Sequence, residues 1–156
     1  MSKLDLQENK TLKLNNLVIK ELRGVHITKI DFEIEKFINQ LQVLKAQSYG
    51  PIVTKLVTSY ANEEGNTVYD YDIYYQVKNY KQYESILKTQ DELKVTDCLF
   101  LNFKGDSIYL PYAYSKIELH LFENDLSAKE EVYSVLKVVD GNEDKVDIDL
   151  FKPVIR

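Results

Sequence analysis

Apolar and polar positions follow one another in a pattern that predicts a strand, a helix and two further strands between Leu12 and Val77. The first segment is apolar-rich and ends at Gly24. Over 31–47, apolar residues recur every three or four positions, which predicts a helix with one buried stripe that ends before Gly50 and Pro51. The stripe comprises Ile34, Phe37, Ile38, Leu41 and either Leu44 or Lys45. Alternating segments at 52–60 and 68–77 predict strands, joined by the turn-rich ANEEGNT.

The same order is repeated after a connecting segment at 78–94, in which we expect a short helix. The expected elements are strands at 95–104, 130–139 and 145–154, a helix at 107–124 and a turn at 140–144. In the helix, the buried stripe comprises Leu110, Tyr114, Ile117 and Leu121, with a C-terminal stop at Asn124. The turn DGNED begins with Asp-Gly, which is typical of hairpins.

The repetition predicts an α+β fold with a duplicated β-α-β-β repeat. Each repeat would place one helix on three antiparallel strands. Together they would form two antiparallel sheets, or one curved sheet, with the helices on one side and a central cleft. We expect residues 1–156 to form a single domain, with repeats at about 12–77 and 95–154 and a linker at 78–94. Units as short as one repeat bury too little surface to be stable alone.

Composition narrows the classes of partner. The chain has 156 residues, 29% of them charged, and a net charge of -5 without a concentrated basic segment, which argues against nucleic acid. One cysteine, Cys98, excludes an internal disulfide and fits a reducing compartment. The polar N-terminus has no secretory h-region, and no apolar run reaches membrane-spanning length. We therefore expect a cytoplasmic protein without a membrane partner.

The order and spacing of short motifs resemble the gyrase-inhibitor-like effector-binding domain, a bacterial family. The motifs of the second half are a strand ending at Gly105, Tyr114 with Ile117, Glu131 with Tyr133, and a last strand reading DIDLFKPV. In the first half, SYGPIVTKLVTSY followed by YDYDIYYQV is also similar to the family. The resemblance covers roughly Leu12 to Val154.

The resemblance implies a concave cleft between two repeats. In relatives this cleft binds lipophilic cations or other small molecules and regulates a fused DNA-binding domain, while some members stand alone and some are small hydrolases. The chain departs from the family in three ways. It has no Trp, it reads VDID where relatives often carry Thr-Glu-Ile, and it carries no helix-turn-helix domain. We therefore expect a stand-alone binding module and no direct control of transcription.

Glu131 and Tyr133 are the central candidates for a ligand site. Residues i and i+2 of a strand share a face, so an anion would lie beside an aromatic ring, as a cationic aromatic ligand requires. The alternative interpretation is a solvated acid beside an ordinary half-buried strand tyrosine. The resemblance assigns the ligand-facing acid to Glu131. The expected ligand-binding residues are Glu131, Tyr133, Tyr75, Tyr112, Tyr49 and Tyr60.

Other chemistry is not indicated, and we expect no catalytic residue, metal or cofactor. Two acid pairs each share a strand face but lack further oxygen ligands, so we expect outward-facing acids that solubilise a strand. These pairs are Asp70 with Asp72 and Asp147 with Asp149. His26 is expected in a loop and His120 on a helix flank, and Cys98 in the core without a basic neighbour.

Three functions remain in view. The first is a module that binds a small apolar or cationic ligand between its repeats. The alternative is a protein–protein interaction protein, such as an accessory or inhibitor of a toxin, enzyme or secretion component, because aromatic enrichment fits interfaces as well as pockets. The third and weakest is a small hydrolase that uses Glu131 and a tyrosine as an acid/base pair. The sequence names neither the ligand nor the partner nor the oligomeric state.

Overall fold

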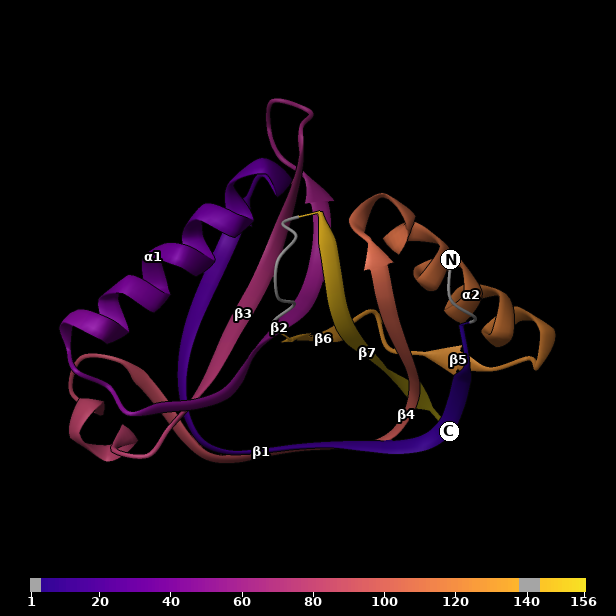
Figure 1. Cartoon of the computed structure of the whole chain (residues 1–156). Helices are drawn as coiled ribbons and strands as arrows, with labels where there is room; N and C mark the ends of the chain where they lie inside the picture. The colour runs from indigo at the N-terminus through magenta and orange to yellow at the C-terminus, as the bar shows by residue number, and fades with distance from the viewer. Residues whose placement is uncertain (1–3, 138–143) are drawn as a thin grey trace. The chain divides into compact units, whose positions relative to one another are not determined.

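The computed structural model describes residues 4–137 and 144–156, and in this part of the chain the elements follow the expected order (Figure 1). The strands are β1 (Leu6–Val25), β2 (Ser48–Ala61), β3 (Thr67–Val77), β4 (Lys88–Asp106), β5 (Ser127–Ala128), β6 (Val132–Lys137) and β7 (Lys145–Ile155). The α-helices are α1 (Ile30–Val43) and α2 (Leu110–Glu123). Three short 3-10 helices are η1 (Ile27–Lys29), η2 (Tyr80–Tyr83) and η3 (Ser107–Tyr109). The α+β fold with a duplicated β-α-β-β order is therefore confirmed, with β5 as a two-residue addition before β6.

The chain contacts divide into two compact units, each built around one repeat. The first-repeat unit comprises Leu14–Leu93, and the second-repeat unit comprises Lys94–Arg156 with the chain up to Lys13. Strands β1 and β4 each contribute to both units, because the division falls within them.

Both long strands begin earlier than the sequence predicts. β1 starts at Leu6 instead of Leu12, and β4 at Lys88 instead of 95, within the segment expected to be a linker. The added stretches, LQENKT and KTQDELK, are polar and carry no strand-like alternation. Strand formation needs only paired backbone groups, and β1 and β4 are hydrogen-bonded neighbours. The short helix expected between the repeats is η2.

In the first-repeat unit, β3 is the middle strand of an antiparallel order β1-β3-β2. Val18 of β1 and Val53 of β2 lie opposite Tyr75 and Tyr74 of β3. Helix α1 runs alongside these strands (Figure 1) and buries Ile30, Phe37 and Leu41. The predicted apolar stripe of this helix is confirmed at Phe37 and Leu41.

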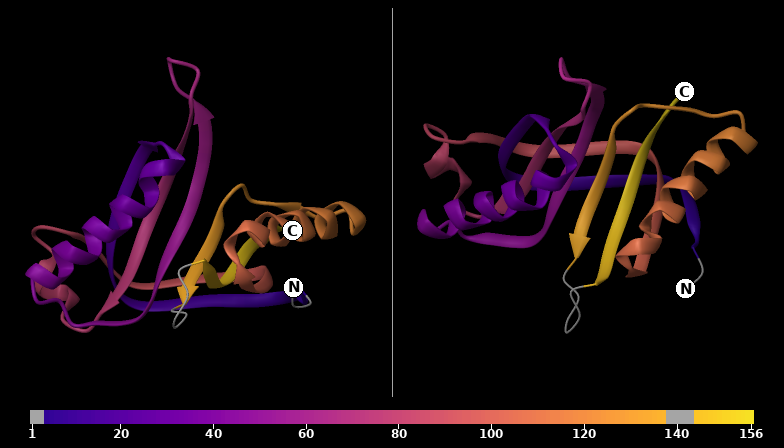
Figure 2. Two further views of the ribbon diagram at one scale, coloured as in Figure 1. Left: turned by 45° about the horizontal axis from the view of Figure 1, so that its top comes forward. Right: turned by 90° about the horizontal axis from the view of Figure 1, so that it is seen from above.

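In the second-repeat unit, β7 is the middle strand and pairs antiparallel with β4, β6 and β5. Figure 2 shows β6 and β7 side by side with α2 running along them. The core between α2 and this sheet comprises Leu4, Leu99, Leu101, Phe103, Ala113, Ile117, Leu121, Val132, Ile148, Leu150 and Val154. The helix therefore covers the face that carries every second residue of β4 and β7.

Both helices end in the same way, which extends the duplication to local geometry. Lys45 and Asp125 follow the helices with positive φ values of 59° and 54°. The next amides, of Ala46 and Leu126, each donate across the last turn to the carbonyl of Leu41 and Leu121 at 2.9 Å. This six-to-one bond is the Schellman termination. It ends α1 at Val43, before the Gly50-Pro51 stop predicted from the sequence, while the predicted stop at Asn124 is confirmed.

The packing of α1 predicts that truncating its two phenylalanines to alanine changes the stability of the protein by very different amounts. Phe37 is 1% exposed and Phe32 is 62% exposed. Phe37→Ala should lower the free energy of unfolding by about 3–5 kcal/mol, because it leaves a cavity. Phe32→Ala, the matched control, should change it by no more than about 0.5 kcal/mol. Urea unfolding measures both, and equal losses would contradict the orientation of α1.

Candidate functional site

Glu131 and Tyr133 lie together at the start of β6. The predicted strand begins at Val132 instead of Glu130, so Glu131 is the residue that immediately precedes it. The Tyr133 Oη donates a hydrogen bond to Glu131 Oε2 at 3.1 Å. The expected proximity of carboxylate and phenol is therefore confirmed. Residues 138–143, which include the end of the predicted strand and most of the predicted turn, lie outside the described residues.

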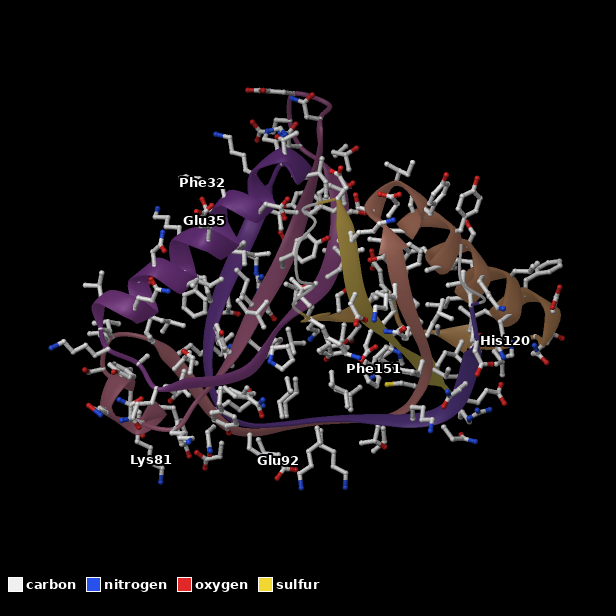
Figure 3. All side chains as sticks on the ribbon, viewed as in Figure 1. Phe32, Glu35, Lys81, Glu92, His120 and Phe151 are labelled. Carbon is white, nitrogen blue, oxygen red and sulfur yellow. The ribbon has the colours of Figure 1, made fainter. Side chains whose placement is uncertain are left out.

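The register of the sheet places two further aromatic rings next to Tyr133. Tyr133 lies opposite Phe151 of β7, and Phe151 lies opposite Phe100 of β4. The ring centroids of Phe100 and Phe151 are 5.1 Å apart, with the ring planes at 60°. Directly opposite residues share a face of the sheet, so the three rings form a row across three strands. Phe151 is labelled on β7 in Figure 3.

This aromatic row lies on the sheet face that α2 does not cover. Leu150, which packs against α2, neighbours Phe151 in sequence, and successive strand residues point to opposite faces. Tyr133 and Phe151 are nevertheless only 3% and 9% exposed, and Glu131 is half-buried. The face thus places a half-buried carboxylate beside two almost fully buried aromatic rings, with Phe100 half-buried next to them.

Polar groups continue the same face beyond the aromatic row. Asn102 lies opposite Asp149, and its Nδ2 donates to Asp147 Oδ1 and Asp149 Oδ1, both at 2.8 Å. Lys137 Nζ pairs with the other oxygen of Asp149 at 3.0 Å. Only 14% of the Asp149 side chain is exposed. The prediction of a solvated, outward-facing acid is therefore wrong for Asp149, which the amide and the ammonium stabilise.

The first repeat carries an equivalent acid pair on β3, where the solvated interpretation also fails. Asp72 is 8% exposed, and its Oδ1 lies 2.9 Å from Nη1 of Arg23. Asp70 Oδ1 accepts a hydrogen bond from the Gly24 amide at 2.9 Å. An arginine on the neighbouring strand thus supplies the counter-charge for the buried Asp72 side chain.

Cys98 is a core residue, as predicted. Its side chain is fully buried, and it lies opposite Pro153 of β7. Burial, together with the nearby charges of Asp97 and Glu131, raises the pKa of the thiol to about 11. The thiol therefore stays protonated at neutral pH and is a poor nucleophile.

The other predicted tyrosines are distributed over both units. Tyr112 is 58% exposed on α2 and stacks on Tyr109 at 6.1 Å, so it belongs to the opposite side of the sheet from Tyr133. In the first-repeat unit, the Tyr49 Oη donates to the Asn15 carbonyl at 3.2 Å. There, the Tyr60 Oη donates to Asp70 at 3.4 Å, and Tyr75 is half-buried. Of the second unit's candidates, the structure brings together Glu131 and Tyr133; a ligand-binding role for any of the six stays a prediction.

Sequence reasoning missed Phe100 and Phe151 as members of this face. Each stands two positions from a polar residue of the same face, Asn102 and Asp149 respectively. That spacing was the available signal, but only the pairing of β4 with β7 shows that the two rings meet.

A separate hollow of about 350 Å³ lies on the α2 side of the second-repeat unit. Its lining residues are Glu118, Leu121, Phe122, Leu126, Ala128, Lys129, Glu130 and Lys152. Lys152 is 7% exposed, and burial lowers the pKa of its ammonium group. Its Nζ donates to the Glu130 carbonyl at 3.0 Å, so this buried lysine has a structural partner.

Over residues 4–137 and 144–156, no group of three or more His, Cys, Asp and Glu side chains is arranged to hold a metal ion. No helix in this described part of the chain is both long enough and apolar enough to span a membrane.

Solved structures with this fold include one that is bound to tetraphenylphosphonium. No family model and no curated protein sequence matches the chain. The EcmrR C-terminal domain is similar with a TM-score of 0.66 and 15% identity, over 99% of this chain and 98% of that chain. SAV2435 bound to tetraphenylphosphonium is similar with a TM-score of 0.54 and 9% identity, over 99% of this chain and 94% of that chain. A hydrolase encoded by lin2189 from Listeria innocua is similar with a TM-score of 0.54 and 8% identity, over 98% of this chain and 92% of that chain. At such identities the likeness establishes the fold alone, and membership of the family stays a prediction.

The raised pKa of Cys98 predicts a pH-dependent contribution to stability. The folded pKa of about 11 lies above the ordinary value of 9.0, so the protonated thiol favours the folded state. This contribution is complete below about pH 9 and is lost as the pH rises toward about 11. Urea unfolding of the wild type and Cys98→Ala should therefore show a stability difference that shrinks as the pH rises through this interval. A constant difference would contradict the burial of the thiol.

Proposed function

We propose that this chain is a small-molecule-binding domain of the gyrase-inhibitor-like effector-binding kind, whose ligands are apolar or cationic. The observation that carries the proposal is the half-buried carboxylate of Glu131, hydrogen-bonded to Tyr133 beside the rings of Phe151 and Phe100. The binding surface is the face of the second-repeat sheet that α2 leaves uncovered.

The arrangement suits a lipophilic cation on physical grounds. Aromatic faces attract a cation through their quadrupole and offer apolar contact area to its substituents. A carboxylate that is partly withdrawn from water interacts with such a cation more strongly than a solvated one. Glu131 supplies this charge beside Tyr133, at the end of the aromatic row.

The comparisons support this choice of ligand class. SAV2435, which shares the fold, has been solved with tetraphenylphosphonium, a cation surrounded by four phenyl groups. The EcmrR C-terminal domain shares the fold over nearly its whole length. Tetraphenylphosphonium is therefore the first probe to use, although the absence of Trp in this chain means that any stacking must come from Phe and Tyr.

Binding of tetraphenylphosphonium, measured by isothermal titration calorimetry, tests the proposal. Glu131→Gln should weaken the affinity at least tenfold, or about 1.4 kcal/mol, because the cation loses its counter-charge. Glu130→Gln is the matched control, since it removes the same charge from the exposed neighbouring position and should bind like the wild type. Triphenylphosphine oxide, a neutral probe, should bind wild type and Glu131→Gln alike.

Two results would contradict the proposal. One is a wild-type protein that binds neither the cation nor the neutral probe. The other is equal weakening by Glu130→Gln and Glu131→Gln, which would mean that the cation responds only to the net charge of -5. The circular dichroism spectrum of each variant shows whether it has kept the fold.

A further inference from the structure

Helix α2 is apolar on two opposite sides. Its inner side buries Ala113, Ile117 and Leu121 against the sheet. Its outer side carries a second row that begins in the preceding η3 with Ile108. We call this row the outer stripe: Ile108, Tyr112, Ser115, Leu119 and Phe122. The four large members are 72%, 58%, 55% and 83% exposed, in chain order. An exposed row of large apolar side chains is unusual on a solvated helix face, so the outer stripe has the character of an interface.

Helix α1 provides a control within the same chain. Phe37 and Leu41 of α1 are buried, and so are Ile117 and Leu121, the residues eighty positions later in α2. Both helices also end with the same Schellman termination, so positions eighty residues apart correspond. The positions of α1 that correspond to the outer stripe are Thr28, Phe32, Glu35, Asn39 and Gln42, all of them exposed. Four of these five are polar, and Figure 3 shows Phe32 and Glu35 on the outer side of α1. The fold itself therefore does not require an apolar outer face.

The spacing of the outer stripe identifies an occupant. Its members follow one another at intervals of four, three, four and three residues, which is the a/d pattern of a helix pair. In an antiparallel pair of two such helices, Ile108 meets Phe122 and Tyr112 meets Leu119. Ser115 then lies against its own copy at the two-fold axis, where a small side chain allows close approach. We propose that the outer stripe binds the outer stripe of a second copy of this chain in an antiparallel, two-fold symmetric pair.

The area of the outer stripe is sufficient for such a pair. Buried aromatic side chains cover about 150–250 Å² each, so the exposed parts of the stripe offer on the order of 500 Å² per copy. Two copies would bury on the order of 1,000 Å², which is the lower end of specific interfaces. Association should therefore depend on protein concentration. It should also strengthen with salt, because two copies that each carry a net charge of -5 repel one another.

Sedimentation velocity over about 10 to 500 µM protein tests the pairing. The wild type should shift from monomer toward dimer as the concentration rises, and more so at high salt. Leu119→Glu should remain monomeric at every concentration, because it places a charge in the middle of the contact. Phe32→Glu, the matched control at the exposed position of α1, should dimerise like the wild type. A wild type that stays monomeric throughout, or Leu119→Glu that dimerises normally, would overturn the proposal.

Cross-linking tests the geometry separately. Ser115→Cys should form an intermolecular disulfide under mild oxidation, because the two copies of residue 115 meet at the axis. Glu35→Cys, at the corresponding position of α1, should not. Cys98 is fully buried and does not compete. Dimers cross-linked by Glu35→Cys but not by Ser115→Cys would overturn the antiparallel pair even if the protein dimerises.

Discussion

The register of β7 against β4 and β6 is the constraint on which the candidate site depends. It aligns Phe100, Phe151 and Tyr133 in one row and turns Leu150 toward α2. Side chains alternate along a strand, so a slip of one residue would exchange the aromatic face with the face that packs on the helix. The apolar core under α2 therefore holds the aromatic row in place, although no member of the row belongs to that core.

Each repeat buries an aspartate at an equivalent position, and different side chains stabilise the carboxylate in the two repeats. Asp72 and Asp149 occupy the same place on the middle strand of each unit, five residues before Val77 and Val154. In the first repeat an arginine pairs with the carboxylate, and in the second an asparagine and a lysine do so. A shared fold has thus kept the acid while the neighbouring strands changed its partner. Glu131 differs from both, because it lies beside aromatic rings at the edge of the row.

Local sequence patterns predicted most of the helices and strands. They could not predict which residues from distant segments contact one another. The apolar stripes of both helices, the repeated order and the proximity of Glu131 and Tyr133 follow from periodicity within short windows. The polar beginnings of β1 and β4 do not, because backbone pairing with a distant strand stabilises them. The same holds for the meeting of Phe100 with Phe151 and for the burial of Asp72. Each depends on a partner from another strand, and no window of sequence contains both.

The most direct test of the central claim is where a bound cation lies. Intermolecular nuclear Overhauser effects between the phenyl protons of tetraphenylphosphonium and assigned aromatic side chains report this at the level of single rings. The account predicts contacts to Tyr133, Phe151 and Phe100, on the face that α2 leaves uncovered. Contacts confined to the exposed aromatic residues of α2, such as Tyr112 and Phe122, would place the ligand on the other side of the sheet and contradict it.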